Sequence, residues 1–211
     1  MRVIRRTFEY MDDKNFLILY TSLVRPHVEF ANQVWGPHLV KDIVILENVQ
    51  KRATKLIPGM KELSYEERLK KLDLPTLSYR RIHGDLIETY KILTRKYDPN
   101  VSSILPLNNN QVCRGHKKIF YERRPRLDIR KYSFCYRIVD IWNRLPSEIV
   151  EAKSVYSFER RLDKFFKDQP IKFNFQEVLT IGSLDESFSD ENEELVSQAV
   201  VPNLLPEEDL I

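Results

Sequence analysis

One segment, residues 41–57, constrains the fold more than any other. At about 100° per residue, its mostly apolar side chains fall on one broad arc of a helix. These side chains are Ile43, Leu46, Val49, Gln50, Ala53, Leu56 and Ile57. The opposite arc carries Lys41, Lys51, Arg52 and Lys55, and Pro58 with Gly59 provides a stop signal. The segment predicts a helix with one buried face, and its basic arc suits either phosphate contact or ordinary solvation.

Two more helices are predicted directly after this one. Ser64 and Glu67 have the spacing of a capping box, in which each side chain satisfies a backbone N–H of the other residue. A short helix follows them, and residues 76–97 then form a long amphipathic helix. One side of the long helix holds Tyr79, Ile82, His83, Leu86, Ile87, Tyr90, Leu93 and Tyr97. Arg81 has Asp85 four residues later, which predicts a local ion pair.

Helices are also predicted on both flanks. Residues 13–24 and 27–35 form two of them, with Pro26 at the first position of the second helix. The core-facing side chains of that second helix are Phe30, Val34 and Trp35. Two more helices cover 133–145 and the segment after Ser154. Their inward side chains are Cys135, Ile138, Val139, Trp142, Leu145, Val155, Phe158, Leu162, Phe165 and Phe166, and the last helix turns Arg160, Lys164 and Lys167 outward.

The composition agrees with a helical fold in a reducing compartment. Only five residues are glycine, which disfavours barrels and sandwiches that are rich in tight turns. Two cysteines do not suggest a disulfide framework. No apolar run approaches the roughly 20 residues that a membrane span requires. We therefore predict a cytoplasmic or nuclear protein that is not secreted and has no membrane partner.

The charge is distributed unevenly along the chain. Residues 173–211 contain no Lys or Arg and ten acidic residues, whereas residues 1–172 hold all 34 basic residues against 21 acidic ones. Low hydrophobicity with charge of one sign predicts disorder over 173–211. The fold class that we predict is mainly α, a multi-helix single domain over 1–172 with room for one small β-hairpin, followed by a disordered acidic tail. The basic domain suggests a polyanionic partner, RNA or DNA.

Residues 114–131 form the most basic window. Its cations are Arg114, Lys117, Lys118, Arg123, Arg124, Arg126, Arg130 and Lys131. Aromatic and aliphatic side chains alternate with them, and two short segments, 118–121 and 127–130, are candidates for an irregular hairpin. Cations can follow a phosphate backbone while aromatic faces stack on unpaired bases. We predict these eight residues as the nucleic-acid contact; the alternative is a loop with its aromatic side chains packed in the core.

Two patterns resemble catalytic or metal sites but are better explained by structure. Residues 10–13 match the Tyr-x-Asp-Asp signature of reverse-transcriptase palms, where strands hold both carboxylates for divalent metal. Here a helix-like run follows, so Asp12 or Asp13 is interpreted as an N-cap. Cys113 and His116 have the spacing of half a zinc site, but a structural site needs four ligands. We predict no catalytic residue, no metal and no cofactor.

Several segments, in order, resemble the part of non-LTR retrotransposon reverse transcriptases that follows the polymerase palm. They are 19–30 (LYTSLVRPHVEF), 34–35 (VW), 46–47 (LE), 49–54 (VQKRAT), 63–69 (LSYEERL), 74–77 (LPTL), 80–81 (RR), 85–87 (DLI), 90–91 (YK), 114–116 (RGH), 142–146 (WNRLP) and Ser154 with Phe158. The resemblance covers roughly residues 7–168. Cys113 departs from it, because a hydroxyl residue is expected there, and the acidic tail matches nothing in these elements.

The resemblance implies RNA-directed DNA polymerases whose catalytic aspartates lie upstream of this segment. The chain then corresponds to their C-terminal, helical, non-catalytic fragment, which would hold template RNA or target DNA beside the palm. Two alternatives stay open from the sequence: a host-retained nucleic-acid-binding module, and a protein–protein adaptor that acts through the acidic tail. The chain alone is not expected to be an enzyme.

Overall fold

The computed structural model describes residues 11–102, 105, 107–108, 116, 118–120 and 125–181. The described part is mainly helical, as predicted, and residues up to Ile181 belong to one compact unit. Its elements are α2 (Asp13–Leu19), the π-helical turn η1 (Tyr20–Val24), α3 (Arg25–Glu29), α4 (Asn32–Trp35), α5 (Val40–Thr54), α6 (Tyr65–Leu72), α7 (Leu77–Leu93), α8 (Pro99–Ser102), α9 (Asp128–Lys131), α10 (Phe134–Asn143), α11 (Ser147–Val150), α12 (Val155–Phe165) and the 3₁₀ turn η2 (Pro170–Lys172). Most of the predicted acidic tail, residues 182–211, lies outside the described residues.

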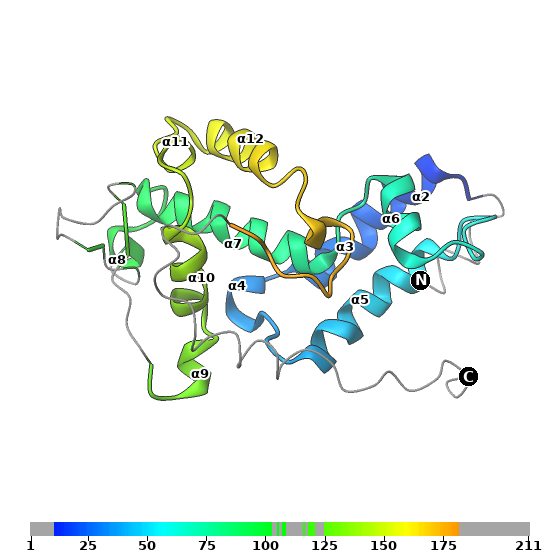
Figure 1. The fold of residues 1–211 in the computed structure, drawn as a ribbon, viewed down its shortest axis with the longest axis horizontal. Helices are drawn as coiled ribbons and strands as arrows, with labels where there is room; N and C mark the ends of the chain where they lie inside the picture. Colours follow the sequence, from blue (N-terminus) through cyan, green and yellow to red (C-terminus); the bar gives the residue numbers. More distant parts are fainter. Residues whose placement is uncertain are drawn as a thin grey trace. The chain divides into compact units, whose positions relative to one another are not determined.

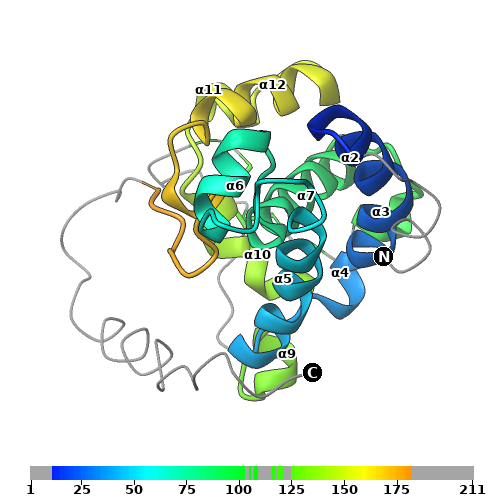
Figure 2. The same cartoon turned by 90° about the vertical axis from the view of Figure 1, so that its right-hand side faces the viewer.

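Helix α7 is the central element of the described fold. Figures 1 and 2 both place α12 on one side of α7 and α5 with α10 on the other. One buried cluster joins α7, α10 and α12 and is rich in aromatic side chains, including Tyr90, Trp142 and Phe158. A second cluster joins α2, α5 and α6 around Phe16, Ala53 and Leu69. The start of α7 is fixed by its N-cap residue Thr76, whose hydroxyl also donates to the Ile171 carbonyl over 2.7 Å.

The N-terminal aspartates serve as a helix start. Asp12 is the N-cap of α2, and its Oδ1 accepts a hydrogen bond of 2.7 Å from the Asn15 backbone N–H. This is the structural role that the sequence predicts for one of these two carboxylates. Tyr10, the first residue of the palm-like signature, lies outside the described residues.

The prediction of a continuous helix over 27–35 with a buried apolar face is wrong. Ala31 adopts a left-handed conformation with φ of 51°, which separates α3 from α4 and turns the chain. Phe30 and Val34 are consequently 77% and 85% exposed. The buried position falls to Asn32 instead, because its amide donates to Asp85 Oδ1 over 3.0 Å.

The predicted inward arc of α5 is confirmed at Gln50 and Ala53, which are completely buried, but the buried face also includes Glu47, which the sequence does not place there. Ile43, Leu46 and Val49 are only half-buried, whereas Glu47 and Gln50 are almost completely buried. Gln50 Oε1 accepts from the Tyr20 hydroxyl over 2.6 Å, and its Nε2 donates to the Tyr65 hydroxyl over 3.1 Å. The Glu47 carboxylate accepts from the Tyr65 hydroxyl over 2.8 Å. These side chains form the α5 network, in which buried polar groups satisfy one another.

A second polar contact replaces the predicted Arg81–Asp85 pair. Asp85 binds Arg137 of α10 instead, with Arg137 Nε 2.9 Å from Asp85 Oδ2. Arg137 Nη2 also donates to the Asn32 carbonyl over 3.0 Å, so one guanidinium joins α4, α7 and α10. A Cβ at Gly36 would lie 2.9 Å from the guanidinium, so a larger residue there would force Arg137 to shift.

The C-terminal helices follow the prediction closely. The predicted inward side chains Ile138, Trp142, Phe158 and Leu162 are buried, and Ser154 caps α12 by accepting from the Ser157 N–H over 3.1 Å. The predicted hairpin is not formed in the described residues, because Asp128–Lys131 is the helix α9. Phe120 pairs with Leu107 in an isolated antiparallel bridge instead.

Candidate nucleic-acid interface

Four of the eight predicted contact residues lie within the described part of the chain. They are Lys118, Arg126, Arg130 and Lys131. The other four, Arg114, Lys117, Arg123 and Arg124, lie outside the described residues. The four described cations separate into two groups, one packed against the protein and one exposed.

Lys118 belongs to the packed group. Its ammonium group lies 5.3 Å from the centre of the Tyr90 ring and 3.4 Å from the Val150 carbonyl oxygen. The backbone of the same residue accepts a 2.9 Å hydrogen bond from the Trp142 indole. Lys118 therefore directs its charge toward the buried aromatic cluster rather than toward a ligand.

The exposed group belongs to α9 and the residues just before it. Arg126, Arg130 and Lys131 are all exposed, and none forms an ion pair with another described residue. Tyr132 anchors the end of this helix, since its ring stacks on His38 with 4.1 Å between the ring centres. Three predicted contact residues are thus exposed within six consecutive positions, residues 126–131.

The aromatic side chains of the basic window serve the core where they are described. Phe120 is 1% exposed, and its ring centre lies 5.8 Å from that of Trp142. Asn143 holds its backbone, donating to the Phe120 carbonyl over 3.1 Å and accepting from the Phe120 N–H over 2.9 Å. Phe120 therefore follows the alternative that the sequence left open, a packed aromatic residue.

His116 is a buried structural histidine. Its Nδ1 accepts from the Lys118 N–H over 3.2 Å, which leaves Nε2 to donate to the Trp142 carbonyl at 3.1 Å. Burial lowers the pKa of His116, in agreement with a neutral ring. Both ring nitrogens are therefore occupied, and no three His, Cys, Asp or Glu side chains of the described part come together as metal ligands.

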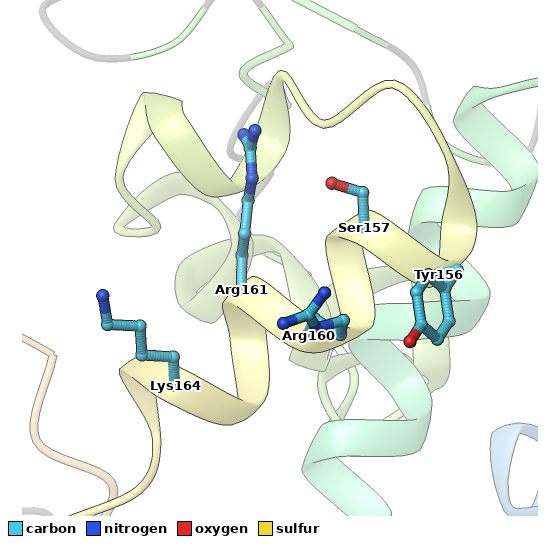
Figure 3. A pocket seen from close by; sticks show the side chains of 5 residues that line it. All are labelled: Tyr156, Ser157, Arg160, Arg161 and Lys164. Carbon is cyan, nitrogen blue, oxygen red and sulfur yellow. The ribbon is translucent and has the colours of Figure 1, made fainter.

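The structure adds a cationic site that the sequence does not single out. A hollow of about 310 Å³ is lined by Tyr156, Ser157, Arg160, Arg161 and Lys164, all from α12 (Figure 3). We call it the α12 hollow. The sequence places Arg160 and Lys164 outward, but it does not show that Arg161 joins them around one depression. Spacings of three and four residues between these cations are the signal that could have revealed it.

Contacts on α12 fix two of these side chains. The Arg160 guanidinium carbon lies 5.8 Å from the centre of the Tyr156 ring, a cation–π contact. Arg161 Nη1 donates to the Glu148 carbonyl of α11. Lys164 forms no ion pair with any described residue.

Neither acidic side chain of α12, Glu159 or Asp163, lines the hollow. Asp163 Oδ1 lies 2.8 Å from His83 Nε2 on α7, on the opposite edge of α12. Burial lowers the pKa of His83 although Asp163 opposes the shift. The charge of Glu159 also acts to raise the pKa of His83, as the charge of Asp163 does. Asp163 thus contacts His83, and none of the three cations at the hollow forms an ion pair with a described residue.

Comparison of the chain with protein-family models, with curated proteins and with solved structures gave no match. In the described part of the chain, none of the helices has both the length and the apolar character that a bilayer crossing needs.

Proposed function

We propose that this chain is a non-catalytic C-terminal segment of a non-LTR retrotransposon reverse transcriptase, and that it contacts RNA or DNA. The observation that carries the nucleic-acid part of this proposal is the grouping of exposed cations at α9 and around the α12 hollow that form no ion pair with a described residue. Exposed cations raise the local concentration of a polyanion and release counterions when they bind phosphates.

The residues of the family resemblance support this proposal through their roles in the fold. Trp142 and Leu145 of the WNRLP segment are buried, and Asn143 holds the Phe120 backbone. Ser64 and Glu67 of the LSYEERL segment form the predicted capping box. A segment whose distinctive residues build a scaffold suits a part that positions nucleic acid beside a catalytic domain.

The non-catalytic part of the proposal rests on the role of Asp12. Its carboxylate is engaged at the start of α2 by the Asn15 backbone N–H. We expect no magnesium-dependent primer extension from the purified chain. A primer-extension signal that disappears in Asp12→Asn and Asp13→Asn variants would contradict the proposal. Asn is as good an N-cap as Asp, so the first variant should keep the helix start.

The binding part is tested by titrating labelled single-stranded RNA, and single-stranded DNA in parallel, into the chain between about 50 and 200 mM salt. We expect the logarithm of the association constant to fall linearly with the logarithm of salt concentration. Replacing Arg126, Arg130 and Lys131 together by Gln should reduce the magnitude of that slope by about 2, since each phosphate contact on a single strand contributes about 0.7. Absence of binding at the lowest salt would contradict the proposal.

A second function, a protein–protein adaptor, is favoured by the exposed apolar side chains of the described part. Phe30, Val34 and Ile129 are each more than three-quarters exposed, and apolar side chains that form an exposed patch mark protein–protein contacts. A partner that is captured by the wild-type chain and lost in a Phe30→Ser/Val34→Ser variant would support this function. An adaptor that acts through the acidic tail, residues 173–211, predicts capture of the partner by that segment alone. An in-frame palm in the genomic sequence upstream would favour the polymerase fragment over a host-retained module.

A further inference from the structure

We propose that the α12 hollow is a binding site for single-stranded nucleic acid, in which the cations hold a phosphate and Tyr156 stacks on the adjacent base. This inference rests on the proposed function, because it assumes that the chain contacts nucleic acid. It assigns the contact to residues outside the basic window 114–131.

The charge at the hollow is suited to a phosphodiester. Three of its five lining side chains are cationic, and no acidic side chain lines it. Arg161 is held in place by the Glu148 carbonyl through Nη1, which leaves the other donors of its guanidinium for a ligand. A guanidinium of fixed direction loses less freedom when it binds a phosphate. The Ser157 hydroxyl adds a neutral donor at the same place, while its backbone N–H is already engaged by Ser154.

The aromatic side chain selects an unpaired base. Tyr156 is 70% exposed, although a large aromatic ring gains stability when it is buried. Figure 3 shows the Arg160 side chain between Tyr156 on one side and Lys164 on the other. A base in single-stranded nucleic acid has a free face for stacking, whereas a base in a duplex is already stacked on both sides. The combination of one aromatic ring and three cations therefore favours single strands.

The hollow is independent of the exposed cations on α9. Both views place α12 and α9 on opposite sides of α7. The two surfaces can therefore be changed separately, and a loss of binding can be assigned to one of them.

The test compares two triple variants of the full chain that remove the same charge. The first replaces Arg160, Arg161 and Lys164 by Gln. The control replaces three exposed cations by Gln: Lys41 and Arg52 of α5, and Lys55, which directly follows α5. Binding of a labelled oligouridine of about 12 nucleotides, within the site sizes of known single-strand binders, is measured by fluorescence anisotropy as salt is varied.

We expect the α12 variant to bind at least tenfold more weakly than the α5 variant. The slope of the logarithm of its association constant against the logarithm of salt concentration should also be smaller in magnitude by about 2. Equal weakening in both variants would mean that only net charge matters and would overturn the inference. Wild-type affinity in the α12 variant would overturn it as well. Failure of the wild-type chain to bind any oligonucleotide would overturn the proposed function itself, so the two failures are distinguishable.

Single substitutions of Tyr156 test the stacking contact. Tyr156→Phe keeps the ring and should bind as the wild type does, whereas Tyr156→Leu should bind about five- to tenfold more weakly, at the low end of the range for one stacked base. When a duplex of equal length is used as competitor, the Tyr156→Leu variant should bind it as tightly as the wild type does. Equal affinity of the Leu and Phe variants would exclude the base contact. The positions are exposed, and the urea midpoints of all variants should match that of the wild type.

Discussion

Helices α5 and α12 both carry cations on an outer arc, yet they distribute their polar groups in opposite ways. α5 turns Glu47 and Gln50 inward, where Tyr20 and Tyr65 bind them. α12 turns Phe158 and Leu162 inward and gathers its cations around an open hollow. The comparison separates two uses of polar side chains. In α5 they join neighbouring helices, whereas in α12 they line a hollow on the outer face.

The largest expected effect is the loss of the inner face of α12. Phe158 is fully buried, and its ring centre lies 4.4 Å from that of Tyr90 and 5.9 Å from that of Trp142. Phe158→Ala should lower the free energy of unfolding by about 3–5 kcal/mol, because the cavity cannot be refilled by its rigid neighbours. Urea denaturation measures the change. Tyr156→Ala, on the outer face of the same helix, should lie within about 0.5 kcal/mol of the wild type.

The next effect is the loss of the α5 network. Gln50→Ala would leave the Tyr20 hydroxyl and the Pro75 carbonyl without the hydrogen bonds that Gln50 now makes over 2.6 and 3.0 Å. Each unsatisfied buried group costs about 1–3 kcal/mol, so the expected loss for the two groups is about 2–6 kcal/mol in total. Arg52→Ala on the outer arc is the control. If both variants unfold at the wild-type urea concentration, the network does not stabilise α5.

The α5 network should also make stability depend on pH, since burial raises the pKa of Glu47 above its usual value of 4.5. Hydrogen bonds from Tyr65 and the Ser78 N–H and the charge of Arg81 oppose this shift but do not cancel it. A raised pKa means that the folded state binds the proton more tightly than the unfolded state does. The associated stability is present below pH 4.5 and is lost as the pH rises through the folded-state pKa.

The measurement is the difference in unfolding free energy between the wild type and Glu47→Gln at several pH values from about 4.5 to 8. The wild type should gain relative to the variant as the pH falls. A difference that is constant with pH would show that Glu47 does not titrate with a raised pKa.

The smallest stability effect concerns the start of each helix. Ser154 accepts from the Ser157 N–H at the start of α12, whereas α5 begins after Leu39 without a side-chain cap. Ser154→Ala should therefore destabilise the chain by about 1 kcal/mol. Leu39→Ala removes no cap and serves as the comparison, although Leu39 is a partly exposed apolar residue. The measurement is the thermal unfolding temperature of the two variants. If Ser154→Ala lowers it no more than Leu39→Ala does, the cap of α12 contributes nothing to stability.

Local signals in the sequence predicted much of the fold. The capping box at Ser64 and Glu67 and the N-cap at Ser154 both form, because each depends on residues three positions apart. Long-range contacts caused the errors. Asp85 binds Arg137, which is 52 residues away, rather than Arg81, and Asn32 takes the buried position expected of an apolar neighbour.

The candidate site shows the same division. The sequence identified the exposed cations of α9, but it could not show that Lys118 packs against Tyr90. It placed Arg160 and Lys164 outward without indicating that they share a hollow with Arg161. That arrangement depends on where the acidic side chains of α12 point, and Asp163 points to His83 on α7.

The most direct test of the contrast between α5 and α12 is to map where RNA lies on the full chain. Oligouridine that carries 4-thiouridine is cross-linked to the protein by light, and the modified peptides are identified by mass spectrometry. The account predicts cross-links within residues 155–165, with Tyr156 among the modified positions, and few within residues 40–54. Cross-links that concentrate on residues 40–54 and avoid α12 would contradict it.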